Sequence, residues 1–180
     1  MSWTNLSGIP QRSFTCGFCG NLVSSGLGSQ YGSGSSIYIC THCKEPTYFR
    51  LDEQFPDIST GKDVAHLPQD LEDLYGEIRR SVGSSCYTAS VLAARKLLMN
   101  LGVAQGAKAG ESFIAYVEYL ANKGFVPPNG KAWVDHIRKK GNEANHEIVL
   151  MGKDDAEELI AFIEMLLKFI YEFPNRVPKE

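Results

Sequence analysis

The sequence of 180 residues lacks any run of 18 apolar residues, the length that a membrane-spanning helix requires. It also lacks an N-terminal segment in which a charged head precedes an apolar core, so we expect no secretory signal. These absences predict a cytoplasmic protein without a membrane segment. Hydrophobic residues make up 43% and charged residues 22%, which is typical of a globular chain and excludes wholesale disorder.

An excess of basic charge is missing too. The net charge is −3, whereas proteins that coat duplex nucleic acid are normally basic. The charge is uneven, since residues 1–50 carry +2 and residues 51–180 carry −5, so any contact with nucleic acid must be local. The sequence contains no Ser-His-Asp order, carboxylate dyad, nucleotide fingerprint or HExxH motif, which leaves the common hydrolase and nucleotide-binding classes without support.

Four of the five cysteines form two pairs with the spacing C-x2-C-x20-C-x2-C: Cys16, Cys19, Cys40 and Cys43. Each pair predicts a tight knuckle, and two knuckles place four thiolates in a tetrahedron that suits one Zn²⁺ ion. Rubredoxin-like iron sites use similar knuckles, so the spacing leaves iron as an alternative. Four sulfur ligands leave no open position for water, which favours a structural metal. Short strands are expected at 36–39 and 46–50, and the whole pattern is typical of a zinc ribbon.

The segment between the knuckles, residues 20–36, contains five Gly and six Ser. This composition predicts a mobile loop rather than a pair of strands. We therefore expect a zinc ribbon over residues 1–50 and a linker over 51–66, followed by a second domain over 67–180.

From residue 67 onward, apolar residues recur with helical spacing and predict about five helices. The first follows Pro68, and the others cover about 84–101, 111–123, 130–146 and 154–173, with ends at Gly102, Gly124 and Pro174. Cys86 is expected in the core, and Arg95 is expected to be buried along its stem and salt-bridged. The fifth helix is too apolar for one buried stripe, which predicts a central position in the bundle or contact with a second subunit, and hence a homodimer. The predicted fold class is α+β: a small β module followed by an all-α bundle.

One stretch of the second domain is distinctly basic, with five basic side chains and one acid between residues 121 and 142. On a helix, Arg138, Asn142, Asn145 and His146 fall on one face, where they could bind a phosphate and move a proton. The alternative is structural, with Asn145 and His146 satisfying backbone groups at a helix end. The candidate catalytic residues are Arg138, Asn142 and His146. The candidate ligand-binding residues are Lys131, Lys139, Lys140 and Asn145.

Residues 66–75, 86–98 and 137–146, the last reading IRKKGNEANH, resemble the domain of unknown function 4145 family. The resemblance covers about 66–175, and a two-knuckle ribbon is a frequent N-terminal companion in that family. The family is similar to the HEPN superfamily of helical bundles (higher eukaryotes and prokaryotes nucleotide-binding). Many HEPN proteins are metal-independent ribonucleases of defence or toxin systems, and they usually act as dimers.

The HEPN motif has an Arg followed, after four to six residues, by a His. This chain departs from the motif, because seven residues separate Arg138 from His146 and Gly141 stands where the Arg is expected. The resemblance therefore implies a HEPN-like binding protein whose partner is RNA, a nucleotide or a protein, with a role in prokaryotic defence or a toxin system. The alternative that it implies is a metal-independent endoribonuclease, which would use Arg138, Asn142 and His146 as a dimer.

Overall fold

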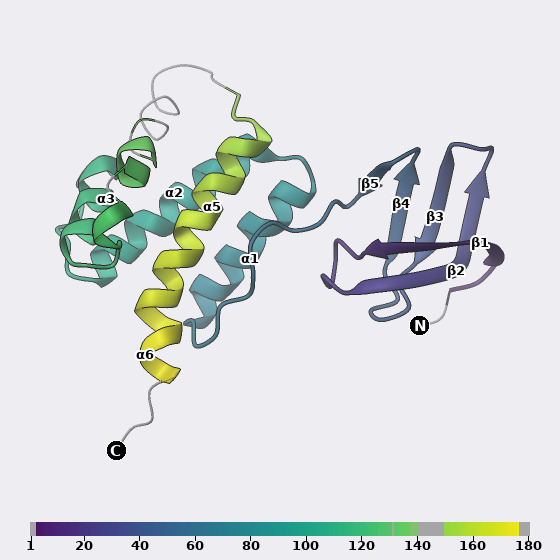
Figure 1. Cartoon of the computed structure of the whole chain (residues 1–180), viewed down its shortest axis with the longest axis horizontal. Helices are drawn as coiled ribbons and strands as arrows, with labels where there is room; N and C mark the ends of the chain where they lie inside the picture. The colour runs from purple at the N-terminus through teal and green to yellow at the C-terminus, as the bar shows by residue number, and fades with distance from the viewer. Residues whose placement is uncertain (1–2, 131, 138, 140–149, 177–180) are drawn as a thin grey trace. The chain divides into compact units, whose positions relative to one another are not determined.

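A computed structural model describes residues 3–130, 132–137, 139 and 150–176 (Figure 1). The chain divides into two compact units. The first, here the β unit, comprises Met1–Ser59 with Gly83–Ser85, and the second, the helical unit, comprises Thr60–Val82 with Cys86–Glu180. The α+β class with an N-terminal β module is thus confirmed.

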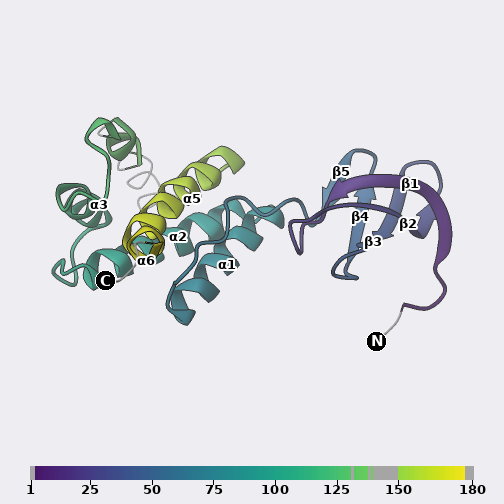
Figure 2. The ribbon, with the colours of Figure 1, turned by 60° about the horizontal axis from the view of Figure 1, so that its bottom comes forward.

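The β unit is one antiparallel sheet whose five strands follow the order of the chain. The strands are β1 (Ser7–Thr15), β2 (Leu22–Tyr31), β3 (Ser35–Ile39), β4 (Pro46–Arg50) and β5 (Glu53–Phe55). The pairing of β1 with β2 shifts register between Gly8 and Arg12, and Figure 2 shows the strong curvature of β1. A small core forms where the rings of Phe14, Tyr38 and Phe49 meet, with centroids 5.2–6.1 Å apart.

The prediction of a loop over residues 20–36 is wrong, because β2 occupies most of that segment and pairs with both β1 and β3. Its glycines allow close backbone approach rather than mobility. A Cβ atom at Gly28 would lie 1.9 Å from the carbonyl oxygen of Ile37 on β3, so only glycine fits there. By contrast, β3 and β4 coincide with the two predicted strands.

The helical unit contains α1 (Gln69–Gly83), α2 (Tyr87–Ala104), α3 (Phe113–Asn122) and α5 (Lys153–Leu167). A 3-10 turn η1 (Pro128–Gly130) precedes helical residues 132–137 and 139, and a π-helical segment η2 (Lys168–Glu172) joins α5 to α6 (Phe173–Arg176). In this unit α5 packs on α2 (Figure 1). The buried side chains of α5 belong to the main hydrophobic core. Within the described residues, no helix combines the length and apolar character that crossing a membrane requires.

Three details of the predicted helices need correction. Gly102 does not end its helix, because α2 continues to Ala104 and Tyr116 of α3 packs where a Cβ at Gly102 would lie. Cys86 is exposed just before α2 instead of buried in the core. Pro174 lies within α6 rather than beyond the last helix, directly after the π-helical segment η2, where the regular α-helical hydrogen-bond pattern is already interrupted.

Residues 51–66, predicted as a linker, contribute to both units. β5 joins the sheet, whereas residues 60–66, here called the strap, lie on the helices. From α1, Arg79 donates hydrogen bonds to the carbonyl oxygens of Thr60 (3.0 Å) and Gly61 (2.9 Å), and Tyr75 donates to that of Lys62 (3.2 Å).

Three carboxylates from the C-terminal helices hold the strap from its other side. Glu157 accepts a hydrogen bond from the Thr60 hydroxyl (3.2 Å). Glu164 accepts from the backbone N–H of Lys62 (2.9 Å), and Glu172 accepts from that of Ala65 (3.2 Å). Val64 of the strap is buried in the helical core, so the strap is an integral part of the helical unit.

Candidate functional site

The four paired cysteines meet in the β unit, with all four Sγ atoms within 4.8 Å of one another. The Sγ atoms of Cys16 and Cys43 are 3.7 Å apart, and those of Cys19 and Cys40 are 3.8 Å apart. A tetrahedral site with metal–sulfur bonds of about 2.3 Å has edges of about 3.8 Å, so the cluster fits a metal ion. These distances are far too long for disulfides, and all four cysteines are free. Among the described residues, no other group of three or more metal-binding side chains has this proximity.

The two knuckles have the same backbone pattern. In the first, the carbonyl oxygen of Cys16 accepts from the N–H of Gly20, and the N–H of Cys16 donates to Asn21. In the second, the carbonyl oxygen of Cys40 accepts from Lys44, and the N–H of Cys40 donates to Glu45. Each knuckle thereby turns its two sulfurs inward, which is how local sequence sets the cluster geometry.

The thiols of the metal-free cluster differ in acidity. Burial raises the pKa of Cys43 to about 12, and the neighbouring thiols of Cys40, Cys19 and Cys16 act in the same direction. Burial also raises the pKa of Cys16. For Cys19, burial alone would raise the pKa, but hydrogen bonds from the side chain and backbone of Asn21 lower it to about 6. One thiolate therefore forms readily, while others need a cation to replace their protons.

The surroundings of the cluster are those of a closed site. His42 lies at the exposed tip of the second knuckle, with Nδ1 3.3 Å from the side-chain amide of Asn21. The fifth cysteine, Cys86, belongs to the helical unit and is not part of the cluster. Four sulfurs and no nearby carboxylate or imidazole ligand among the described residues indicate a site that holds a metal for structure rather than for reaction.

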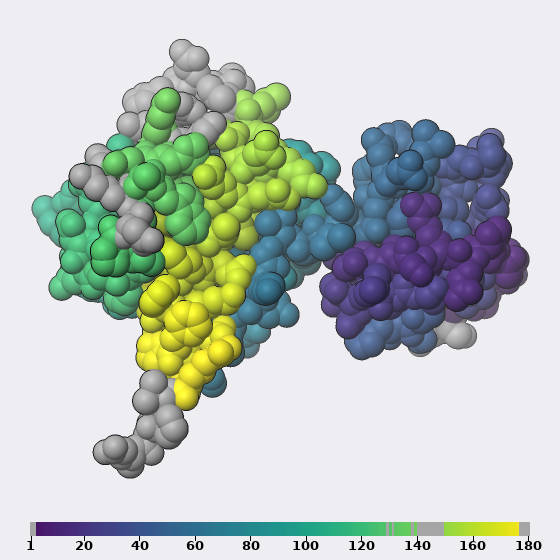
Figure 3. Space-filling model, in the orientation of Figure 1, coloured from purple at the N-terminus to yellow at the C-terminus, as the bar shows by residue number. Residues whose placement is uncertain are grey.

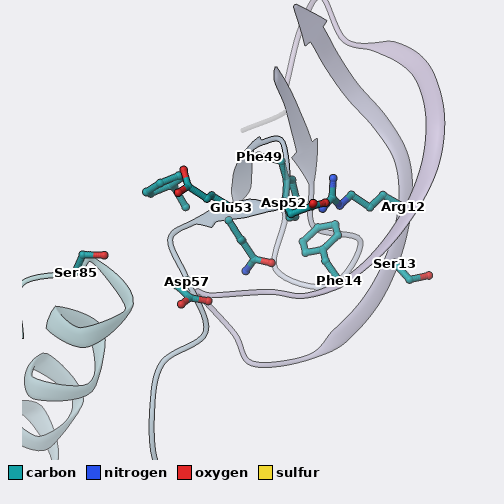
Figure 4. A pocket seen from close by; sticks show the side chains of 10 residues that line it. Arg12, Ser13, Phe14, Phe49, Asp52, Glu53, Asp57 and Ser85 are labelled. Atoms are coloured by element: carbon teal, nitrogen blue, oxygen red, sulfur yellow. The ribbon is translucent and has the colours of Figure 1, made fainter. Parts of the chain in front are cut away.

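The β unit also has a hollow of about 450 Å³ that sequence reasoning missed (Figure 4). The guanidinium of Arg12 stacks on Phe49, 3.9 Å from the ring centroid, and lines the hollow together with Asp52 and Glu53. Gln54 is fixed there by donating to the carbonyl oxygen of Thr15 (2.8 Å). The carboxylates on this hollow make it unsuited to a phosphate ligand.

Most of the predicted catalytic and ligand-binding residues lie outside the described part of the chain: Lys131, Arg138, Lys140, Asn142, Asn145 and His146. Lys139 is described, and it is helical and exposed. The structure does describe the residues on either side of this segment. Ile137 precedes Arg138, Met151 follows after residue 150, and both are buried and line the same small cavity.

That cavity lies between α2, α5 and the helical residues 132–137, and it has room for about one water molecule. Arg95 of α2 lines it opposite two acidic residues of α5, Asp155 and Glu158. The carboxylate of Glu158 also lies 2.7 Å from Nε2 of His136. Ile137 and Met151 therefore lie beside a charged cluster in which Arg95 is buried and Asp155 and Glu158 are half-buried.

Arg95 is the most deeply buried cation among the described residues, with 6% of its surface exposed. Its guanidinium lies over the ring of Phe113, 4.3 Å from the centroid, and burial lowers its pKa. The expectation that Arg95 is buried is confirmed, but its place beside a cavity and a groove was missed. The signal in the sequence was a cation pair, Arg95-Lys96, in the middle of an otherwise uncharged helix.

On its other side, Arg95 lines an open groove of about 350 Å³ between α2 and the start of α3. The groove is also lined by Leu92, Lys96, Met99, Glu111, Ser112 and Phe113. Arg95 thus lines both the groove and the cavity beside Ile137 and Met151.

The sequence model of a protein family described as a domain of unknown function, DUF4145, matches residues 76–180, more than half of the chain. The chain belongs to this family. The DUF4145 match begins within α1 and includes Arg95 and the basic segment, whereas the cysteine cluster lies outside it. The family resemblance read from the sequence is therefore confirmed for the helical part. No curated protein and no solved structure matches the chain at a significant level.

Proposed function

We propose that this DUF4145 protein binds RNA through a HEPN-like helical unit, and that its β unit is a zinc ribbon with a structural Zn²⁺ ion. The observation that carries the RNA proposal is the buried Arg95 at the cavity where Ile137 and Met151 meet. A deeply buried cation is costly and clusters with function more often than a surface cation does. Arg95 shares the cavity with Ile137, and Ile137 is followed in sequence by the cations Arg138, Lys139 and Lys140, which supports phosphate binding near this point.

The zinc assignment rests on the chemistry of the cluster. Cys16, Cys19, Cys40 and Cys43 supply four soft thiolate ligands at tetrahedral spacing, which Zn²⁺ accepts without redox chemistry. Iron would fit the same spacing, and a visible absorption spectrum separates the two, because Zn²⁺ is colourless and ferric thiolate sites absorb strongly. Bound metal would serve to hold the small sheet together, since its core is too small to do so alone.

The RNA proposal is tested by fluorescence anisotropy with labelled single-stranded RNA across a salt series. In the variant Arg138→Gln with Lys140→Gln, binding should be lost. In each single variant, the lost phosphate contact should flatten the log–log salt slope by about 0.7. Ser33→Ala, in the β2–β3 turn, is the control and should bind as the wild type does. If the wild type binds no RNA even at low salt, the RNA proposal is wrong, and a protein-binding module becomes the better account.

The endoribonuclease alternative is separated by incubating total RNA with the wild type and with His146→Ala. Cleavage by the wild type alone would assign His146 as a general acid or base and make the protein an enzyme. Binding without cleavage would retain the non-catalytic proposal. A role in defence or in a toxin system would be judged from neighbouring genes, and it rests here only on the HEPN resemblance.

We also propose that the chain forms a homodimer through a stripe on its C-terminal helices, defined as Ala161, Met165, Phe169 and Phe173. These residues line a groove of about 290 Å³ on α5, η2 and α6, the yellow-green to yellow surface in Figure 3. Phe169 and Phe173 are each 41% exposed, and their rings meet edge to face at 5.3 Å. The stripe has a small residue at one end and a large one at the other, so an antiparallel second copy would place Phe173 over Ala161 at both ends.

A further inference from the structure

We infer that the groove between α2 and α3 contacts a phosphate of the same bound RNA strand and the nucleoside beside it, with Lys96 and Arg95 as contact residues. This inference rests on the proposed RNA binding and adds a second surface to it. The described residues that line the groove include none of the candidate catalytic or ligand-binding residues named from the sequence, and the inference makes the groove a part of the binding site.

The charge of the groove favours an anionic ligand. The 18-residue helix α2 carries two charged side chains, and both are the adjacent cations Arg95 and Lys96. The acid on the opposite wall, Glu111, lies 3.7 Å from the ammonium of Lys108 and is partly neutralised by it. The groove is therefore locally cationic although residues 51–180 as a whole carry −5. A cationic groove in a domain that is acidic as a whole can attract a phosphate at this place.

The shape of the groove suits more than a free phosphate. Leu92, 52% exposed, and Met99 form an apolar wall beside the two cations, and the Ser112 side chain lines the opposite side. Apolar surface beside cations is the combination that holds an unstacked nucleoside together with its phosphate. In a duplex the bases stay stacked inside, so the groove should prefer a single strand.

Arg95 makes the groove continuous with the proposed site. Its side chain lines the groove on one side and, on the other, the cavity at Ile137, the residue next to Arg138. A strand that passes Arg95 from the side of Ile137 would enter the groove. Lys96 is exposed on α2 and can reach a phosphate there without disturbing the core.

The test measures the affinity of the full chain for a fluorescent oligo(U) RNA of about 16 nucleotides, and for the same strand in a duplex. The variant Lys96→Gln should weaken single-strand binding by about tenfold or more, as expected for the loss of a charged hydrogen bond. Arg80→Gln, an exposed cation of α1 that does not line the groove, removes the same charge and should change affinity less than about twofold. Arg95→Gln should weaken binding at least as much as Lys96→Gln, measured on protein whose circular-dichroism helix signal shows that it is folded.

The outcomes separate the two proposals. If the wild type binds and Lys96→Gln behaves like Arg80→Gln, the groove inference is overturned while the proposed RNA binding stands. If the wild type prefers duplex RNA, the groove inference is overturned as well. If the wild type binds neither RNA, both proposals fail. Should Arg95→Gln unfold the helical unit, Lys96→Gln alone decides the matter, because its side chain lies outside the core.

Discussion

Gly20 and Lys44 occupy equivalent positions in the two cysteine knuckles. Both have a left-handed backbone, with φ of +69° and +67°. Each donates its backbone N–H to the carbonyl oxygen of the first cysteine of its pair, at 2.8 Å and 3.1 Å. Glycine adopts this conformation without penalty, whereas lysine incurs a steric cost through its Cβ. The second knuckle is therefore built with strain that the first avoids.

This difference predicts opposite effects of two substitutions on metal binding. Gly20→Ala should cost about 1–2 kcal/mol, which weakens metal affinity about five- to thirtyfold. Lys44→Gly should strengthen it slightly, by about 0.5 kcal/mol. Both are measured by competition with a metallochromic chelator. Gly8→Ala is the control, because it has no positive φ and a Cβ there meets nothing within 4 Å. Equal effects at positions 8 and 20 would contradict the explanation.

Removal of the metal should unfold the β unit and spare the helices. The helical unit has its own core, which includes Leu98, Phe162 and Leu166, whereas the β unit depends on its cluster. Elemental analysis should find one metal ion per chain, and a chelator should leave most of the circular-dichroism helix signal. Cys86→Ser should retain the metal, while Cys40→Ser should lose it. Collapse of the helix signal on chelation would show that the helical unit needs the metal too.

Gly102→Ala should destabilise the protein although alanine favours helices. A Cβ at Gly102 would lie 2.5 Å from Cδ1 of Tyr116, so α2 and α3 would have to separate. The expected cost of overpacking is about 1–3 kcal/mol, against a propensity gain of about 1 kcal/mol, measured by urea unfolding. In the matched variant Gly76→Ala, the new Cβ meets only the flexible guanidinium of Arg80, so stability should rise. A rise in both variants would mean that Tyr116 can move aside easily.

Tyr75 should make the helical unit sensitive to alkaline pH. Burial, together with the nearby charge of Glu164, raises the pKa of Tyr75 well above its usual value. Since the folded pKa is the higher one, the contribution is present below the unfolded pKa of about 10 and is lost as pH rises beyond it. Tyr75→Phe should be less stable at pH 7 by about 0.5–1.5 kcal/mol, because it loses the hydrogen bond to Lys62.

The measurement is the free energy of unfolding of wild type and Tyr75→Phe from pH 7 to pH 11. The difference between the two should shrink above pH 10 and then reverse. A constant difference over the whole range would show that the Tyr75 hydroxyl does not govern the alkaline loss.

The proposed dimer predicts a mass of about twice 19.9 kDa by light scattering at micromolar concentration. Phe169→Ser should shift it toward the monomer, because the substitution removes apolar surface from the stripe. Val103→Ser, which changes an exposed apolar residue of α2, should leave the mass unchanged. A monomeric wild type would show that the dimer proposal is wrong, whereas the RNA proposal would stand.

The sequence predicted those features that depend on local chemistry. The C-x2-C spacing fixes each knuckle within a few residues, so the cysteine cluster could be predicted from the sequence alone. The surplus of apolar residues in α5 predicted either a central position or contact with a second subunit, and the core indeed buries many of them.

The features that depend on distant neighbours were missed. The strand β2 is rich in Gly and Ser, and its structure comes from pairing with β1 and β3, which no local pattern reveals. The role of Gly102 depends on Tyr116 of the next helix, and that of Arg95 on the residues of α3 and α5 around it. Arg138, Asn142, Asn145 and His146 lie outside the described residues, so their arrangement on one helical face stays a prediction.

Because of the strap, the boundary of the family match differs from the boundary of the folded helical unit. The family match starts at residue 76, but Leu71, Tyr75 and the strap residue Val64 belong to the same buried core. A gene fusion or a protease cut made at the family boundary would therefore strip the helices of part of their interior. Only a fragment that begins before Thr60 would carry everything that the helical unit needs to fold by itself. In this chain the family match therefore begins later in the sequence than the part that folds as one unit.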